Sequence, residues 1–213
     1  MASRPLADGD TAARVLDIAS RLVQTRGYNG FSYADIAAEL QVTKASLHYH
    51  FPTKAELGRC LIERYEARFL AALAAIDRDA SGAAEKLRRY MRIYADVLQD
   101  RQMCLCGMLA AEHGTLPEPM RGMLQHYFDA NEHWLAGVLD AGRNAGDLQF
   151  DGAPAAVAAM LLGALEGAMM LARSYGDASR FDAAAARLLT NLRSAARTAR
   201  APRTARMSGR AAR

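Results

Sequence analysis

The chain has 213 residues, 51% of them hydrophobic, which is enough for one large domain or two small ones. Its three cysteines are too few for a disulfide framework of the secreted kind, and the first ten residues lack the apolar segment of a signal peptide, so we expect a protein of the reducing cytoplasm. The most apolar stretch, 155–172, is interrupted by Glu166 and dominated by Ala and Gly, which favours a buried interface helix over a membrane span.

The net charge of +4 is unevenly distributed along the chain. Residues 1–58 carry six basic and six acidic residues, whereas residues 193–213 carry seven Arg and no acidic residue. The basic end is poor in large apolar residues and is predicted to be a disordered tail, which either has no role or adds non-specific affinity for DNA. Phosphate binding near the N-terminus therefore depends on the local placement of a few groups.

Apolar residues recur at helical spacing throughout the chain, and no stretch shows sustained alternation with a period of two. The sequence therefore predicts an all-α fold. Val15, Ile18 and Leu22 mark a first helix over about 10–26, which Gly27 is expected to end as a left-handed cap.

The segment 31–57 predicts two short helices joined by a three-residue turn. Ser32 is expected to cap the first helix, with Asp35 as a short version of the Glu in a capping box. Residues 41–43 break the apolar pattern, and Thr43 is expected to cap a second helix over 44–50. Because so short a helix is unstable alone, its neighbours must hold it, as in a helix-turn-helix whose second helix enters the major groove of DNA.

Residues 10–57, and most specifically the ending SLHYHF at 46–51 followed by Lys54, resemble the DNA-binding domain of the tetracycline-repressor (TetR/AcrR) family. The resemblance implies an N-terminal three-helix DNA-binding domain, a larger C-terminal helical domain that binds an effector, and a homodimer. The chain departs from the family pattern at the first turn position, where Gln41 replaces the usual Gly. A left-handed residue is expected there, which costs a non-Gly side chain about 1 kcal/mol.

Nine residues around the second short helix are candidates for DNA contact. His48, on the exposed side of this helix, is the leading candidate for a base contact; Lys44 can donate to guanine, and Ala45 can touch a thymine methyl group. The resemblance makes Tyr49 and His50 phosphate-facing. The remaining candidates lie at helix starts, where free N–H groups suit phosphate, and are Ser32, Tyr33, Ser46 and Lys54.

Six further helices are predicted, which makes nine in all. A capping box at 53–56 opens a long helix that reaches Leu73, and the others cover about 83–97, 104–113, 117–142, 154–173 and 180–196. The expected organisation is a DNA-binding domain over 10–57, an effector-binding and dimerisation domain over 58–197, and a basic tail over 198–213.

The resemblance places the homodimer contact on the last two long helices. Small residues at steps of three and four in the first of these permit close packing across a two-fold axis: Ala155, Ala158, Ala159, Gly163 and Gly167. The alternative is that the same residues pack within one subunit.

Cys104 and Cys106 are about 200° apart on a helix, so they cannot easily bond each other, and we expect at least one to face an effector cavity. One alternative is that both cysteines are small buried hydrophobes. The other is that one thiol lies near a helix N-terminus, which lowers its pKa. Residues 104–112 resemble family members in which a cysteine here senses electrophiles. Glu166 is expected to pair with an Arg or His, or to face the effector. The other candidate lining residues are Tyr94, Met103, His126, Phe128, Trp134 and Met169.

The leading functional hypothesis is a repressor that binds a palindromic double-stranded DNA operator as a homodimer and releases it when a small-molecule effector binds. The alternative is a repressor triggered by oxidation or alkylation of Cys104 or Cys106. The sequence shows no Gly-rich phosphate loop, no metal-ligand cluster and no nucleophile motif such as GxSxG, so we expect neither an enzyme nor a bound metal or cofactor.

Overall fold

The structure is a computed structural model and describes residues 8–194 of the chain. Within this range it holds nine α-helices, one short 3-10 helix and no strand, which confirms the predicted all-α fold. The α-helices are α1 (Asp8–Arg26), α2 (Tyr33–Leu40), α3 (Lys44–His50), α4 (Lys54–Asp79), α5 (Ala83–Gln99), α6 (Leu105–Ala111), α7 (Glu118–Asn144), α8 (Pro154–Tyr175) and α9 (Ser179–Ser194). The predicted basic tail over 198–213 lies outside the described residues.

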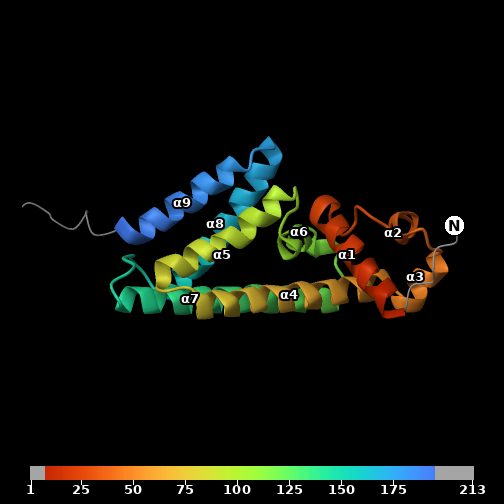
Figure 1. The fold of residues 1–213 in the computed structure, drawn as a ribbon, viewed down its shortest axis with the longest axis horizontal. Helices are drawn as coiled ribbons and strands as arrows, with labels where there is room; N and C mark the ends of the chain where they lie inside the picture. The colour runs from red at the N-terminus through yellow and green to blue at the C-terminus, as the bar shows by residue number, and fades with distance from the viewer. Residues whose placement is uncertain (1–7, 195–213) are drawn as a thin grey trace, which may run out of the picture.

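The helices form an elongated molecule with α1, α2 and α3 gathered at one end (Figure 1). The long helices α4 and α7 lie side by side along its length, and α8 packs against both α7 and α9 toward the other end. Helix α6 contacts α1 on one side and α4 and α7 on the other. It is therefore one of the elements that join the N-terminal helices to the larger helical body.

The two helix starts in the segment 31–57 form as the sequence predicts. Ser32 and Asp35 make a complete capping box, and the Thr43 hydroxyl accepts a hydrogen bond from the Ser46 N–H. Gln41 is left-handed, with φ 58° and ψ 41°, so the expected cost of a non-Gly residue at this turn is present in the fold.

Two local predictions need correction. The predicted helix over 104–113 is shorter, because Cys104 has a non-helical backbone and serves as the N-cap of α6, while His113 belongs to a separate 3-10 turn, His113–Thr115. At the start of α4 the Thr53 hydroxyl accepts from the Glu56 N–H, but the return bond from the Glu56 carboxylate is not formed, so only half of the predicted capping box is present.

A small polar network lies inside the helical body. The Tyr90 hydroxyl donates to Oδ1 of Asn131 at 2.7 Å, and the Asn131 amide donates to the Tyr94 hydroxyl at 3.2 Å. All three side chains are buried, and the rings of Phe69 and Tyr127 pack around them. Because buried polar groups are costly unless they are paired, this closed network fixes how α5 and α7 face each other.

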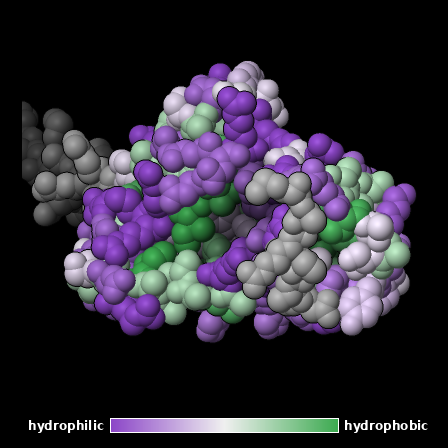
Figure 2. Space-filling model, turned by 45° about the vertical axis from the view of Figure 1, so that its right-hand side comes forward, coloured by the Kyte–Doolittle hydropathy of each residue, from purple (hydrophilic) through white to green (hydrophobic). Residues whose placement is uncertain are grey.

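Hydrophilic residues cover most of the face shown in Figure 2, and the apolar residues appear as separate patches, the largest of them recessed between hydrophilic ridges. The large apolar side chains most exposed on the described part of the chain are Tyr49 on α3 and Met160, Met170, Leu171 and Tyr175 on α8. Two surfaces, one on α3 and one on α8, are therefore left with apolar groups in solvent.

Candidate DNA interface and effector body

Helix α3 is held by one buried residue and presents the rest of its surface. Leu47 is fully buried, whereas Lys44, Ala45, His48 and Tyr49 are exposed. Ser46 and His50 are half-buried, and the His50 and Tyr49 rings pack nearly perpendicular to each other. Lys44, His48 and the first turn of α2 also frame a shallow groove of about 320 Å³. This arrangement gives α3 the free polar face that a recognition helix needs.

His48 is exposed but oriented by two neighbours. Its ring lies 4.6 Å from the Tyr33 ring, centroid to centroid, and its Nδ1 lies 3.1 Å from the Pro52 carbonyl oxygen. Because a carbonyl oxygen only accepts hydrogen bonds, Nδ1 must carry the hydrogen. In the neutral ring Nε2 is then an acceptor, which suits the amino group of adenine or cytosine in the major groove.

Tyr33 packs against the His48 ring, and its side chain does not extend into solvent. Its side chain is buried, its hydroxyl donates to the Phe51 carbonyl at 2.7 Å, and burial raises its pKa to about 12. Of the predicted phosphate contacts from Tyr33, only one from its backbone N–H is compatible with this packing.

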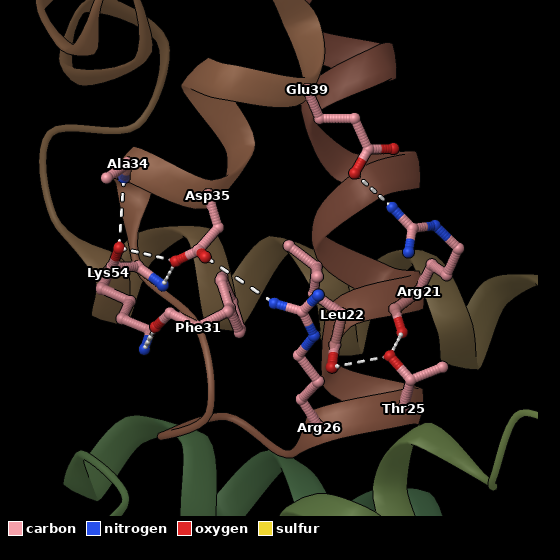
Figure 3. Close-up of polar contacts among 10 residues, drawn as sticks. Arg21, Leu22, Thr25, Arg26, Phe31, Ala34, Asp35, Glu39 and Lys54 are labelled. Carbon is pink, nitrogen blue, oxygen red and sulfur yellow. Dashed lines mark hydrogen bonds and ion pairs between the residues drawn. The ribbon is translucent and has the colours of Figure 1, made fainter.

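Polar contacts also tie α2 to α1 (Figure 3). Asp35 accepts from the Ser32 N–H and hydroxyl, and these bonds hold the pKa of its carboxyl below the ordinary value. The Asp35 carboxylate also lies 3.7 Å from the Arg26 guanidinium, and Arg21 pairs with Glu39. The Ser32 side chain is therefore used to cap α2. The predicted contact between Ser32 and DNA is supported only by the exposed position of this residue.

Lys54 has a structural role that sequence reasoning did not foresee. Its ammonium donates to the carbonyl oxygens of Tyr28 and Phe31 and lies over both of their rings, at 4.7 and 4.3 Å from the centroids. Desolvation lowers its pKa, and the charges of Glu112 and Asp35 partly offset this. Since two of its three donors are used internally, Lys54 chiefly fixes the loop between α1 and α2.

The C-terminal end of α1 is attached to the helical body by backbone contacts. The Glu112 carboxylate, just after α6, accepts from the Tyr28 N–H at 2.6 Å and the Asn29 N–H at 3.2 Å. Gly27 is left-handed, with φ 84°, and a Cβ there would lie 2.6 Å from Oε1 of Glu112, so the close approach requires glycine. The loop is thus bound to α6 by charge-assisted hydrogen bonds.

Gln24 and Arg173 complete this attachment. The Gln24 side chain donates to the Met103 carbonyl at 2.9 Å, and the Met103 N–H donates back to the Gln24 carbonyl at 3.1 Å. The Arg173 guanidinium, from α8, donates to the carbonyls of Gln24 and Thr25. We call these contacts, together with those of Glu112, the α1 junction. No local pattern in the sequence marks its partners, which lie up to 149 residues apart.

Two family models match the chain. The model of bacterial regulatory proteins of the tetR family matches residues 15–59, and the model of the tetracyclin repressor-like C-terminal domain matches residues 83–188. A TetR-family regulator from Agrobacterium tumefaciens is 32% identical, with a TM-score of 0.85 over 87% of this chain and 99% of that one. The chain belongs to the TetR family.

Other relatives cover most of the chain at lower identity. The transcriptional regulator AcuR of Cereibacter sphaeroides is 29% identical over 70% of this chain and 69% of its own length. The repressor NemR of Escherichia coli is 26% identical over 77% of this chain and 84% of its own length. This TetR-family chain is thus a transcriptional regulator of the helix-turn-helix class, and no enzyme family is indicated among its relatives.

The predicted effector-lining residues are spread over the body of this TetR-family protein. Trp134 lies at a surface cavity of about 540 Å³ and donates to Asp77, and His126 is exposed and bonded to Glu66 at 2.8 Å. Phe128 and Glu166 are half-buried, whereas the rest are buried in the core: Tyr94, Met103, Cys104, Cys106 and Met169. The structure therefore does not bring the nine residues together around one cavity.

Both thiols are buried, which favours the first of the two alternatives, small buried hydrophobes, over a thiol with a lowered pKa. Burial raises the pKa of Cys104, with a further contribution from the charge of Glu166, and burial raises that of Cys106 as well. Cys104 does lie at a helix N-terminus and accepts from the Gly107 N–H at 3.4 Å, but loss of solvent outweighs that bond. The environment keeps both groups as thiols rather than reactive thiolates.

Glu166 does not form the predicted pair with Arg or His among the described residues. Its side chain is half-buried, its Oε2 lies against the backbone of Gly107, and its Oε1 is enclosed with no hydrogen-bond partner. Burial raises the pKa of its carboxyl, which bonding with Cys104 only partly offsets. The unpaired carboxylate of Glu166 therefore destabilises the folded state.

Substitutions on α3 should separate base contacts from phosphate contacts. His48→Ala should reduce discrimination between the operator and a site altered at one base pair by about 1–3 kcal/mol, because a base-edge acceptor is lost. Tyr49→Phe, which removes one exposed hydroxyl, should weaken binding to all sequences by about 0.5–1.5 kcal/mol and leave their ratio unchanged. Fluorescence anisotropy with both DNAs measures this; a change of preference in Tyr49→Phe alone would reverse the two roles.

Glu166→Gln should stabilise the protein at pH 7 by about 1–3 kcal/mol, because the enclosed oxygen no longer carries charge. The raised pKa means that the folded state holds the proton more tightly than the unfolded state. The wild-type penalty is therefore absent below about pH 4.5 and grows as pH rises through the folded pKa. Urea unfolding between pH 4.5 and 8 tests this against Glu63→Gln, a surface control expected to change stability by less than about 0.5 kcal/mol. A destabilised Glu166→Gln protein at pH 7 would contradict it.

Proposed function

We propose that this chain is a cytoplasmic repressor that binds a palindromic operator as a homodimer and releases it when a small-molecule effector binds the helical body. The observation that carries the proposal is the exposed face of α3, on which His48 and Tyr49 project from a helix whose one fully buried residue is Leu47. Residues 10–57 form the DNA-binding domain in this proposal, and residues 58–197 form the effector-binding and dimerisation domain. The names of DhaR and NemR, two relatives that are repressors, support the direction of regulation.

The exposed face of α8 supports the homodimer. Met160, Met170 and Leu171 are between 56% and 60% exposed, which is unusual for large apolar side chains. Gly163 and Gly167 lie between them, and a Cβ at either position would meet nothing within 4 Å in the single subunit. Ala158 is buried within its own subunit, as the alternative packing expects, whereas Gly163 and Gly167 remain available to a partner.

The same helix is long and apolar enough to cross a bilayer by length and composition, and 44% of its apolar window is buried in the protein. The burial of one face against α7 and α9 and the small residues on the other favour a second protein surface over lipid. We therefore assign the exposed face of α8 to the partner subunit.

Release by a non-covalent effector is favoured over the thiol trigger. Cys104 and Cys106 are each no more than 1% exposed, and burial raises the pKa of both thiols. An oxidant or electrophile would have to enter the core and react with a protonated thiol, which is a poor nucleophile. A ligand that binds one arrangement of the body better than another needs no such reaction.

Selection of sites from random DNA should recover an inverted repeat whose half-sites lie about one helical turn apart or somewhat more.

Gly163→Glu should convert the dimer to a monomer and lose at least tenfold in affinity for the repeat, because it places a charge in the interface. Gly122→Glu is the matched control, since it adds the same side chain at another open helical position, on α7.

Light scattering and anisotropy report the two effects separately. Recovery of a lone half-site bound by a monomer, or a Gly163→Glu protein that stays dimeric, would overturn the proposed assembly.

A further inference from the structure

A cavity of about 580 Å³ lies where α5 ends and α8 turns into α9. Its floor includes the buried apolar residues Leu98 and Ala172. Two arginines, Arg101 and Arg173, line it together with polar groups that include Gln99 and Gln102. The cavity therefore combines a small apolar floor with two guanidinium groups, at a place that the predicted effector site did not include.

Arg101 occupies a position that normally belongs to glycine. Its φ is 57°, its N–H donates to the Leu98 carbonyl at 2.9 Å, and the Gln102 N–H donates to the Val97 carbonyl at 3.1 Å. These two bonds form a Schellman motif at the end of α5, with Arg101 as the left-handed residue. An arginine there carries backbone strain that glycine would avoid, so the fold retains its side chain at a cost in stability.

The Arg101 guanidinium forms no ion pair or hydrogen bond with another described residue, whereas Arg173 is engaged. Arg173 donates to the last carbonyls of α1 at Gln24 and Thr25, and so belongs both to the cavity and to the α1 junction. Asp177 is the one acidic residue of the lining. Its carboxylate is used at the start of α9, where it accepts from the Ser179 N–H and hydroxyl and lies 3.7 Å from Arg180.

We propose that this cavity binds a small organic anion, a carboxylate or phosphate on an apolar body, with Arg101 holding the anionic group. The planar fork of a guanidinium matches both head groups in a bidentate manner, and the apolar residues Leu98 and Ala172 line the cavity where the apolar body would lie. Three observations point to this class of ligand: the strained arginine, the cavity, and the engagement of Asp177, the acidic residue among the described lining, with Ser179 and Arg180 rather than with Arg101.

Occupancy of the cavity would act on the DNA-binding helices through Arg173, and this step rests on the proposed function. An anion between the two arginines competes with the carbonyls of Gln24 and Thr25 for the Arg173 guanidinium. Loss of those bonds weakens the α1 junction, which Met103 and Glu112 then hold alone, and changes the orientation of α3 relative to its counterpart in the partner subunit. A ligand that prefers the loosened arrangement thereby weakens operator binding.

Calorimetric titration of the full-length protein tests the site without DNA. Benzoate and phenyl phosphate are the probes, and benzamide is the neutral control, all at matched ionic strength. We expect at least one anion to bind with a dissociation constant of about 1 mM or tighter and benzamide to bind at least tenfold more weakly. The tighter anion identifies the preferred head group. Failure of both anions, or equal binding of benzamide, overturns the proposal.

Arg101→Gly separates a ligand-binding role from a structural one. It should raise the melting temperature by about 2–4 °C, because strain is relieved, while weakening the anion at least tenfold. Gln41→Gly is the matched control, since it relieves the same strain at the turn before α3 and should leave anion binding unchanged. An Arg101→Gly protein that binds the anion normally, or that melts at a lower temperature, overturns the assignment.

Anisotropy with the operator then tests the effector role. The anion should weaken operator binding by the wild-type protein and not by Arg101→Gly. Anion binding that leaves operator affinity unchanged overturns the effector role, whereas failure to bind any operator without ligand counts against the proposed function instead.

Discussion

The α1 junction is the interaction on which the arrangement of this protein depends. The end of a helix leaves backbone carbonyls without partners, and the loop that follows adds unpaired N–H groups. Here the carbonyls of Gln24 and Thr25 are satisfied by Arg173 and the N–H groups of Tyr28 and Asn29 by Glu112. Every one of these partners comes from the helical body, so the N-terminal helices complete their own hydrogen bonding only when they are docked in this orientation.

This dependence gives the body a means of controlling α3. The short helix α3 packs against α2, and α2 packs against α1. Lys54, which follows α3, is bound to the same loop that Glu112 binds. A ligand need not distort α3 itself to change DNA binding; it need only favour a different arrangement of Glu112 or Arg173. Glu112 directly follows α6, and Arg173 belongs to α8. Both helices also pack against other helices of the body, so a rearrangement within the body can reach the junction.

The helix-turn-helix could be predicted from the sequence because its determinants are local. Ser32, Asp35 and Thr43 lie within three residues of the groups they cap, and Gln41 stands where the turn needs a left-handed residue. Asn131 could have been found in the same way, as a polar residue on the apolar face of α7 between Phe128 and Leu135. Both signals depend only on helical spacing.

The α1 junction, the role of Lys54 and the cavity at Arg101 could not be predicted, because they depend on contacts between distant segments. Glu112 meets Tyr28 across 84 residues, and Lys54 gives its donors to a loop that spacing alone cannot place beside it. The choice between a packed and a reactive thiol stayed open for the same reason, since the position of Cys104 at a helix start is local but its burial beside Glu166 is not. The cavity at Arg101 likewise requires the ends of α5 and α8 to meet.

Amide hydrogen exchange at Tyr28 and Asn29 tests the α1 junction most directly, because their N–H groups donate to the Glu112 carboxylate. In the wild-type protein both amides should exchange slowly, and in Glu112→Ala both should lose protection while the amides in the middle of α2 keep theirs. Fast exchange at Tyr28 and Asn29 in the wild type, or protection that survives Glu112→Ala, would contradict the view that the helical body holds the DNA-binding helices in place.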